Sequence, residues 1–293
     1  MKSTCPRPRH GLTCTRRSLT ATVALAALVL APGALDAQHP IEGMEWSVSM
    51  VRERGAPVAP VFEGWYKNDN GTYSLVFGYH NLNADQAVSI PLGPDNYIEP
   101  AQYDGMQPTY FYPIPENGSR RQFGAFTVVV PADFGDREVV WNLTHLGHKW
   151  SIPAHIRSPH YILDAVHAPA RGTWAATMKF DRSAPGVRGR DGVVTGPISA
   201  RVGVPVPLSV WVDPAPQPRN LVWWFKHQGP GEVAFSAQES TVLGGRGDVE
   251  VTTTALFSAP GNYLLRVMAV EDVGTIEFHC CWTNGYVRVT VTE

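Results

Sequence analysis

The chain has 293 residues, 24 basic and 26 acidic, and a formal net charge of −2. Residues 1–37 have the features of a removable leader, and without them 19 basic and 25 acidic residues remain, a net charge of −6. An acidic chain without a basic run is a poor nucleic-acid binder, because phosphate neutralisation needs clustered Lys and Arg.

The N-terminal segment is typical of a secretory signal peptide. A basic stretch, residues 2–17, precedes an apolar run, residues 19–31, and a cleavage site lies before Gln38. The apolar run is shorter than the roughly 20 residues that span a bilayer, and no later stretch is long enough. An uncleaved anchor and, from Arg16–Arg17, twin-arginine export stay open as alternatives. We therefore expect residues 1–37 to be removed and the mature chain to be periplasmic or secreted.

A first domain is predicted at residues 38–163. Its short runs of Val, Thr, Tyr, Phe and Trp, separated by Gly, Pro, Asn and Asp, are typical of β-strands. Asn70-Gly71 predicts a tight hairpin, because this dipeptide accepts the positive φ angles of such a turn. The strands expected here are residues 46–51, 64–67, 72–79, 87–90, 123–130, 138–144 and 149–152. A long loop, residues 91–115, interrupts them.

A flexible linker is predicted at residues 164–196, because the stretch 182–192 has almost nothing to bury. A second domain follows at residues 197–293. Its expected strands are residues 198–202, 206–212, 221–226, 232–235, 249–257, 263–270 and 286–292. Seven short strands in about a hundred residues match an immunoglobulin-like sandwich. The predicted fold is therefore all-β, with two β-sandwich domains in tandem, the second immunoglobulin-like.

The stretch 258–267, with Pro260-Gly261 before Tyr263, resembles the tyrosine corner of immunoglobulin-like and polycystic-kidney-disease-type domains. The resemblance implies that the Tyr263 hydroxyl ties the corner to nearby backbone. Trp223 or Trp224, on the third strand of this domain, would then supply the central core aromatic.

Three further stretches resemble a family of uncharacterised exported bacterial proteins. They are residues 62–66 with 77–79, residues 130–136, and residues 280–284. The resemblance covers most of residues 60–293, and it implies no activity.

The most unusual motif is His279-Cys280-Cys281-Trp282, in a loop expected between the last two strands. Exported chains meet oxidising conditions, so the adjacent cysteines could form a vicinal disulfide. Thiolates with His279 would instead suit copper or zinc, if the backbone turns so that both sulfurs reach one ion. A third interpretation buries one cysteine as a small apolar residue and leaves the other free or paired between chains. The sequence leaves the three open and requires no cofactor.

Aromatic residues mark a second candidate surface. The predicted binding residues are Trp65, Tyr66, Tyr110, Tyr112 and Trp282, since such rings stack on sugars or seat a partner chain. The alternative is that the rings form the long loop's own core. His145 and His148 flank a predicted two-residue turn, where they favour a solvated hairpin over a metal site.

Catalysis finds little support in the sequence, which contains no Gly-x-Ser-x-Gly, His-Glu-x-x-His or phosphate-binding glycine motif. We therefore expect an exported, non-catalytic binding or adhesion-type structural protein, with a protein or glycan as partner. A periplasmic copper- or zinc-binding or redox-responsive protein, and a carbohydrate-binding protein, are the alternatives.

Overall fold

The computed structural model describes residues 53–113, 121–169, 172–214, 216–245, 247–271 and 280–293. The predicted leader, the strand expected at 46–51 and His279 lie outside these ranges. Within them the fold is all-β, as predicted, with two short 3-10 turns, η1 (Ala101–Tyr103) and η2 (Pro159–Tyr161). Residues Val51–Glu293 form one compact unit.

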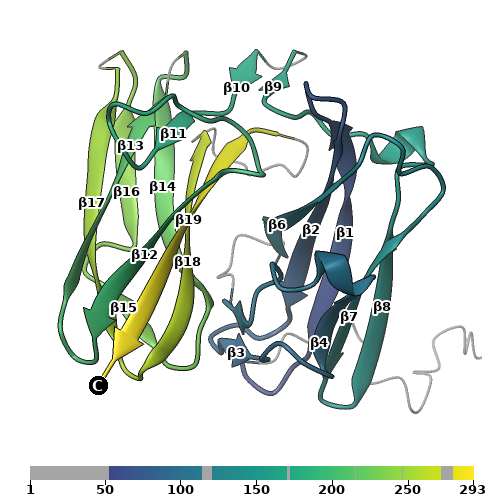
Figure 1. Cartoon of the computed structure of the whole chain (residues 1–293), viewed down its shortest axis with the longest axis horizontal. Helices are drawn as coiled ribbons and strands as arrows, with labels where there is room; N and C mark the ends of the chain where they lie inside the picture. The colour runs from purple at the N-terminus through teal and green to yellow at the C-terminus, as the bar shows by residue number, and fades with distance from the viewer. Residues whose placement is uncertain (1–52, 114–120, 170–171, 215, 246, 272–279) are drawn as a thin grey trace, which may run out of the picture. The chain divides into compact units, whose positions relative to one another are not determined.

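The N-terminal half contains two three-stranded antiparallel sheets (Figure 1). Their strands are β1 (Val58–Lys67), β2 (Tyr73–Asn81) and β6 (Arg121–Val130), and β4 (Asn96–Glu99), β7 (Val139–His145) and β8 (His148–Ala154). Both predicted hairpins are present, as β1–β2 and β7–β8. Leu146 and Gly147 have φ of 51° and 80°, as a tight turn between β7 and β8 requires. Phe77, Phe126 and Trp141 are fully buried in the core of this half.

The expected long loop contains more structure than its sequence indicates. Strand β4 adds to β7, and β3 (Val88–Ser89) pairs with β5 (Tyr110–Phe111). The buried side chain of Asn96 donates to the carbonyl oxygens of Ile90 and Pro108 and accepts from Trp141 Nε1. One polar side chain thus satisfies backbone groups that a buried loop would otherwise leave unpaired.

The C-terminal half is a sandwich of a four-stranded and a five-stranded sheet (Figure 1). The first has the order β11 (Thr177–Lys179), β13 (Val206–Asp213), β17 (Val249–Phe257) and β15 (Val233–Phe235). The second has the order β12 (Val193–Arg201), β19 (Trp282–Thr292), β18 (Gly261–Glu271), β14 (Arg219–Gln228) and β16 (Glu239–Leu243). All seven predicted strands are present; β11, and the exposed edge strand β16, were not predicted.

Two details support the immunoglobulin-like assignment. The Tyr263 hydroxyl donates to Ala259 O at 2.7 Å and accepts from Gly231 N at 3.0 Å, which confirms the tyrosine corner. Trp224, with no exposed surface, lies in the core between the sheets, so it is the central aromatic. Trp223 lies on the opposite face of the same strand, because neighbouring strand residues point to opposite faces.

The segment expected to be a flexible linker, residues 164–196, has regular structure. It contains β9 (His167–Ala168), β10 (Thr173–Trp174), β11 and the start of β12. Arg190 is fully buried, and its carbonyl oxygen accepts from the Asn284 side chain at 2.8 Å. Polar side chains can be buried where carbonyls and ring faces satisfy them, which composition alone does not show. The domain boundaries stay a prediction.

Candidate functional site

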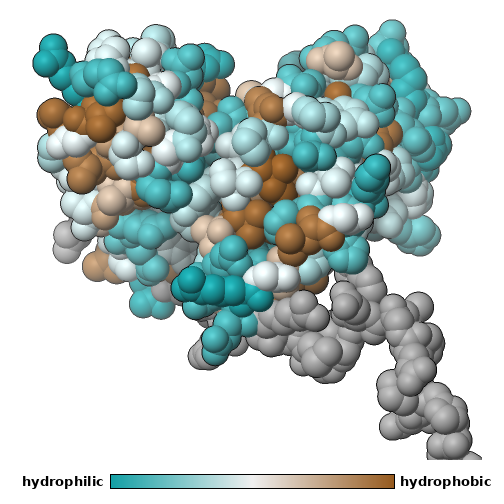
Figure 2. Space-filling view, turned by 90° about the horizontal axis from the view of Figure 1, so that it is seen from below, coloured by the Kyte–Doolittle hydropathy of each residue, from teal (hydrophilic) through white to brown (hydrophobic). Residues whose placement is uncertain are grey.

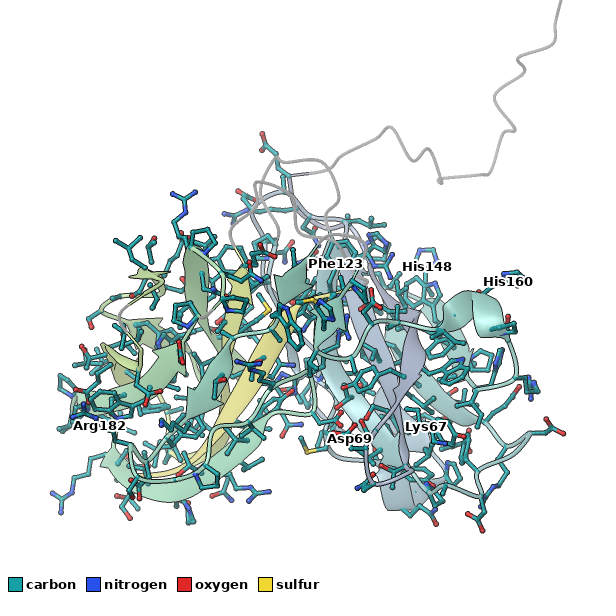
Figure 3. The ribbon with its side chains drawn as sticks, turned by 90° about the horizontal axis from the view of Figure 1, so that it is seen from above. Lys67, Asp69, Phe123, His148, His160 and Arg182 are labelled. Atoms are coloured by element: carbon teal, nitrogen blue, oxygen red, sulfur yellow. A yellow bond between two sulfur atoms is a disulfide. The ribbon has the colours of Figure 1, made fainter. Side chains whose placement is uncertain are left out.

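The outer face of the five-stranded sheet, which faces away from the sandwich core, is covered over part of its length by the N-terminal half. Eight consecutive residues of β18, from Tyr263 to Val270, are buried, although a strand with one solvated face would alternate. Phe123 of β6 packs against Met268, Val270 and Trp282 on this face, and Figure 3 shows it between the two halves. We call these contacts of β6 and residues 102–112 with the outer face the junction.

Buried guanidinium groups hold the junction together. Arg266 Nη1 donates to the carbonyl oxygens of Gly124 and Ala125 at 2.8 and 2.9 Å. The Arg190 guanidinium lies 4.2 Å from the centre of the Trp282 ring, and its Nη1 donates to Asp164 O. Burial lowers the pKa of both groups. Carbonyl oxygens and ring faces therefore offset part of the desolvation of these charges, and the Glu63 carboxylate favours the charged form of both groups.

Glu63 is the carboxylate of this buried layer. It is 3% exposed, accepts from Gly124 N at 2.8 Å and lies 3.4 Å from an Arg121 nitrogen. Gly78 leaves room for it, since a Cβ there would overlap Glu63 Oε1. Burial raises the Glu63 pKa from 4.5 to about 7, and the neighbouring Arg121 only partly opposes this.

A second carboxylate, Asp191, lies in the segment that was expected to be a linker and connects it to the N-terminal half. Its oxygens accept from the Tyr66 hydroxyl at 3.1 Å and the Ser74 hydroxyl at 2.7 Å. Burial raises the Tyr66 pKa, so the phenol stays protonated and keeps donating. Asp191 is thereby held in one orientation at the edge of the junction.

Two clefts open where the junction ends, and we call them together the junction groove. The acidic cleft, about 280 Å³, is lined by Tyr103, Asp104, Val129, Asp191 and Tyr286, among others. The basic cleft, about 270 Å³, is lined by Val194, Pro197, Asn262, Arg288 and Thr290, among others. Met106 lines both, so the clefts adjoin.

The two clefts differ in charge. Asp104 and Asp191 are the charged side chains that line the acidic cleft, and Arg288 is the charged side chain that lines the basic cleft. Valines 129 and 194, which border the groove, are 46% and 42% exposed. Figure 2 shows apolar residues near the middle of the face seen from below, between regions that are mostly polar. The groove therefore combines apolar walls with opposite charges at its two ends.

The residues predicted to bind a ligand make contacts within the chain. Trp282 and Tyr66 are 1% and 4% exposed, and both rings lie near Arg190. Their burial leaves no ring face for a ligand in this structure; the rings serve the junction instead. Trp65, half-buried, donates from Nε1 to Ser158 O.

The aromatic loop also contacts the C-terminal half. Tyr110 donates to Glu232 at 2.9 Å, and the Tyr112 hydroxyl accepts from Lys226 N at 2.8 Å. Both tyrosines are half-buried, and Phe111 between them is fully buried. As ligand contacts, Trp65, Tyr110 and Tyr112 stay a prediction.

The adjacent cysteines are joined as a vicinal disulfide. Cys280 and Cys281 are 8% and 3% exposed and pack with Ala168 and Ala175, beneath β9 and β10. Metals bind thiolates, so this oxidised pair offers copper or zinc no ligand until it is reduced. Among the described residues, no group of three or more His, Cys, Asp or Glu is placed to hold a metal ion. His145 Nδ1 accepts a hydrogen bond from Val58 N at 3.2 Å.

The sequence offered Glu63 only as one of several scattered acids that are usually solvated, and it did not single out Arg190, Arg266 or Arg288 as site residues. The first three are buried by contacts between segments 60 or more residues apart, which no local pattern reveals. Arg288 follows the alternating pattern of β19 and looks like an ordinary solvated residue. The one available signal was Gly124, whose φ of 52° and closeness to Trp282 require glycine within a buried strand.

No protein-family model and no curated protein matches the chain. Among solved structures, it is similar to the ASH / PapD-like domain of human CEP192, at 9% identity and TM-score 0.28, over 47% of this chain and 96% of that one. It is also similar to domains 4 and 5 of the S-layer protein SbsC, at 12% identity and TM-score 0.25, over 54% of this chain and 66% of that one. The titin domains z1z2 in complex with telethonin match at 11% identity and TM-score 0.21, over 80% of this chain and 96% of that one. The fold assignment therefore rests on the strand order, the facing sheets and the tyrosine corner.

No helix in the described ranges is both long enough and apolar enough to cross a bilayer.

Proposed function

We propose that this chain is an exported, non-catalytic binding protein, and that the junction groove is its binding surface. The observation that carries the proposal is the separation of charge along the groove, with Asp104 and Asp191 at one end and Arg288 at the other. Both halves of the molecule line it, and the buried hydrogen bonds of Arg266 with Gly124 O and Ala125 O hold the two halves together. A site fixed before the ligand arrives loses less conformational entropy on binding.

The carboxylates of the groove favour binding over catalysis. Asp104 Oδ1 accepts from Ile98 N at 2.9 Å and from the Gln107 side chain at 2.6 Å. Asp191 is held in the same way by two hydroxyls. Each is oriented by the fold's own donors, which suits a fixed charge that positions a ligand more than a base that takes up and releases a proton.

A binding screen with groove variants tests this proposal. The chain beginning at Gln38 is immobilised and exposed to a displayed peptide library and to a glycan array. Val129→Lys and Val194→Lys place a charge at exposed positions of the groove, and Val204→Lys, at a valine 51% exposed elsewhere, is the matched control. We expect ligands that the control retains and the groove variants lose. Ligands that all three variants retain equally would place binding elsewhere and contradict the proposal.

Export is tested separately. The basic stretch, the apolar run and the cleavage site before Gln38 support it. Expression of the full chain in a bacterial host, followed by N-terminal sequencing of the periplasmic fraction, should give Gln38 as the first residue. A chain that keeps residues 1–37 and stays in the cytoplasm would contradict it.

One observation favours a redox-responsive role as a second candidate. The vicinal disulfide of Cys280 and Cys281 immediately precedes β19, and Cys281 Sγ lies 3.6 Å from the Thr173 hydroxyl. Reduction would release a covalent constraint at the start of β19, whose outer face belongs to the junction. Intact mass with and without reductant tests the bond itself: a gain of two hydrogens supports it, and no change excludes this candidate. Copper or zinc binding by the reduced chain, read by elemental analysis, tests the metal alternative.

A further inference from the structure

We infer that the junction groove binds an extended peptide of about five residues, with a basic group at the Asp104–Asp191 end and a carboxylate at the Arg288 end. This inference rests on the proposed function and specifies the ligand of the same surface. Four features of the groove carry it: its length, its charges, its apolar walls and the blocked strand beside it.

The strand register gives the length. Strands β12 and β19 are parallel, and Val193 lies beside Gly285. Asp191 therefore lies near the level of Thr283, five positions before Arg288 on β19. At about 3.3 Å per residue, the two charged ends are roughly 16 Å apart along the strands. An extended peptide rises by a similar amount per residue, so about five residues span the groove.

The charges of the groove define the two ends of the ligand. The acidic cleft has two carboxylates, and Arg190, the neighbour of Asp191, is fully buried against Trp282 and does not line it. At the other end Arg288 is exposed and forms no ion pair with another described residue. Beside it Thr290 donates to Asn262 at 3.1 Å, which places polar groups around any anion that Arg288 binds. Guanidinium–carboxylate pairs are among the stronger hydrogen-bonded contacts.

Between the ends, the walls suit small apolar side chains. Val129 and Val194 are both exposed beside Met106, which both clefts share. Burial raises the Tyr286 pKa to about 12, so its phenol stays a hydrogen-bond donor in the acidic cleft. Alternate side chains of an extended peptide would face these walls.

The edge strand β12 cannot accept a full added strand, so the peptide is recognised through its side chains and its two ends. Its register is interrupted between Thr195 and Ile198, and Pro197 has no N–H to donate. A sugar ligand would require exposed ring faces, and the predicted rings Tyr66 and Trp282 are buried.

Peptide libraries with defined ends test the inference. Three libraries share four randomised positions: the first has an N-terminal Lys and a free C-terminal carboxylate, the second the same Lys and a C-terminal amide, and the third an N-terminal acetylated Glu and a free carboxylate. Each is screened against the chain from Gln38, and affinities of retained peptides are measured by isothermal titration calorimetry. We expect retained peptides from the first library, and about tenfold weaker binding when the same peptides carry an amide or Glu.

Substitutions at each end complete the test. Arg288→Gln should weaken the carboxylate peptides about tenfold and leave their amide forms unchanged, because the amide has already lost the same contact. Asp104→Asn, which keeps an acceptor for Ile98 N and Gln107, should weaken peptides with Lys but not those with Glu. Arg201→Gln, at an exposed arginine of β12, is the matched control and should change neither.

The outcomes separate this inference from the proposed function. Peptides retained in the groove but insensitive to the amide, to Arg288→Gln and to Asp104→Asn would overturn the inference and leave a binding groove. If glycans bind the parent but not Val129→Lys, and no peptide is retained, the inference is likewise overturned and the binding groove remains. No retained ligand of either class would contradict both.

Discussion

The two faces of the five-stranded sheet are both buried over much of their length, yet they are built from different residues. The inner face contributes aliphatic side chains and Trp224 to a dry core. The outer face, beneath β6, buries Arg266, Asn284 and Tyr286. Apolar burial alone stabilises the inner face, whereas the outer face also depends on each charged or polar group finding a partner. The inner face therefore defines the sandwich, and the outer face defines how the two halves meet.

Adjacent tryptophans give the sharpest test of this difference. Trp224 has no exposed surface and lies in the inner core, and Trp223 packs half-buried on the outer face. Trp224→Ala should lower the free energy of unfolding by about 3–5 kcal/mol, because it leaves a large cavity. Trp223→Ala should cost about half as much, since its site is partly open to solvent.

Urea unfolding of both variants at one pH measures the effect. The two substitutions are chemically identical and one residue apart, so each is the other's control. Equal losses would mean that the outer face is packed as tightly as the core, and the comparison would fail.

The sequence predicts the inner face well because alternation is local. The strands that contribute Val206, Leu208, Val210 and Val212, or Tyr263 and its corner, can be identified from spacing and turn residues. The outer face breaks that rule: Arg266, in an alternating strand, should be solvated, but carbonyls from β6, more than 140 positions away, bury it. Gly189 and Arg190, in the stretch expected to be a flexible linker, show the same limit, because their burial depends on Thr283, Asn284 and Trp282, far away in the sequence.

The pH dependence of stability tests the charged layer. Glu63 has a pKa of 4.5 when unfolded and about 7 when folded, because burial disfavours its charged form. Between these values the folded state binds more protons, so the stability that Glu63 contributes is complete below pH 4.5 and lost as the pH rises to about 7. Glu63→Gln imitates the protonated form, so the variant should gain up to about 3 kcal/mol relative to the parent between pH 4.5 and pH 8.

His227 acts in the opposite direction. Burial lowers its pKa from 6.5 to about 3, so its contribution is complete above pH 6.5 and lost as the pH falls toward 3. Stability of Glu63→Gln should therefore rise between pH 4.5 and 6.5 more steeply than that of the parent. Urea midpoints from pH 4.5 to 8 measure both slopes. Parallel curves for the two proteins would show that Glu63 does not titrate in this range.

The smallest expected effects come from two tyrosine hydroxyls, one on each side of the comparison. Tyr263→Phe removes two hydrogen bonds of the corner, to Ala259 and Gly231, and should cost about 1–2 kcal/mol. Tyr112→Phe removes the acceptor for Lys226 N at the junction and should cost about 1 kcal/mol. Tyr161→Phe, at a ring 44% exposed, should change stability by less than about 0.5 kcal/mol and serves as the control.

If the junction is a fixed part of the fold, the loss of stability in Tyr112→Phe appears in the same cooperative unfolding transition as the loss in Tyr263→Phe. A separate, earlier transition in Tyr112→Phe alone would mean that the two halves part before either unfolds, and that the groove between them is not fixed.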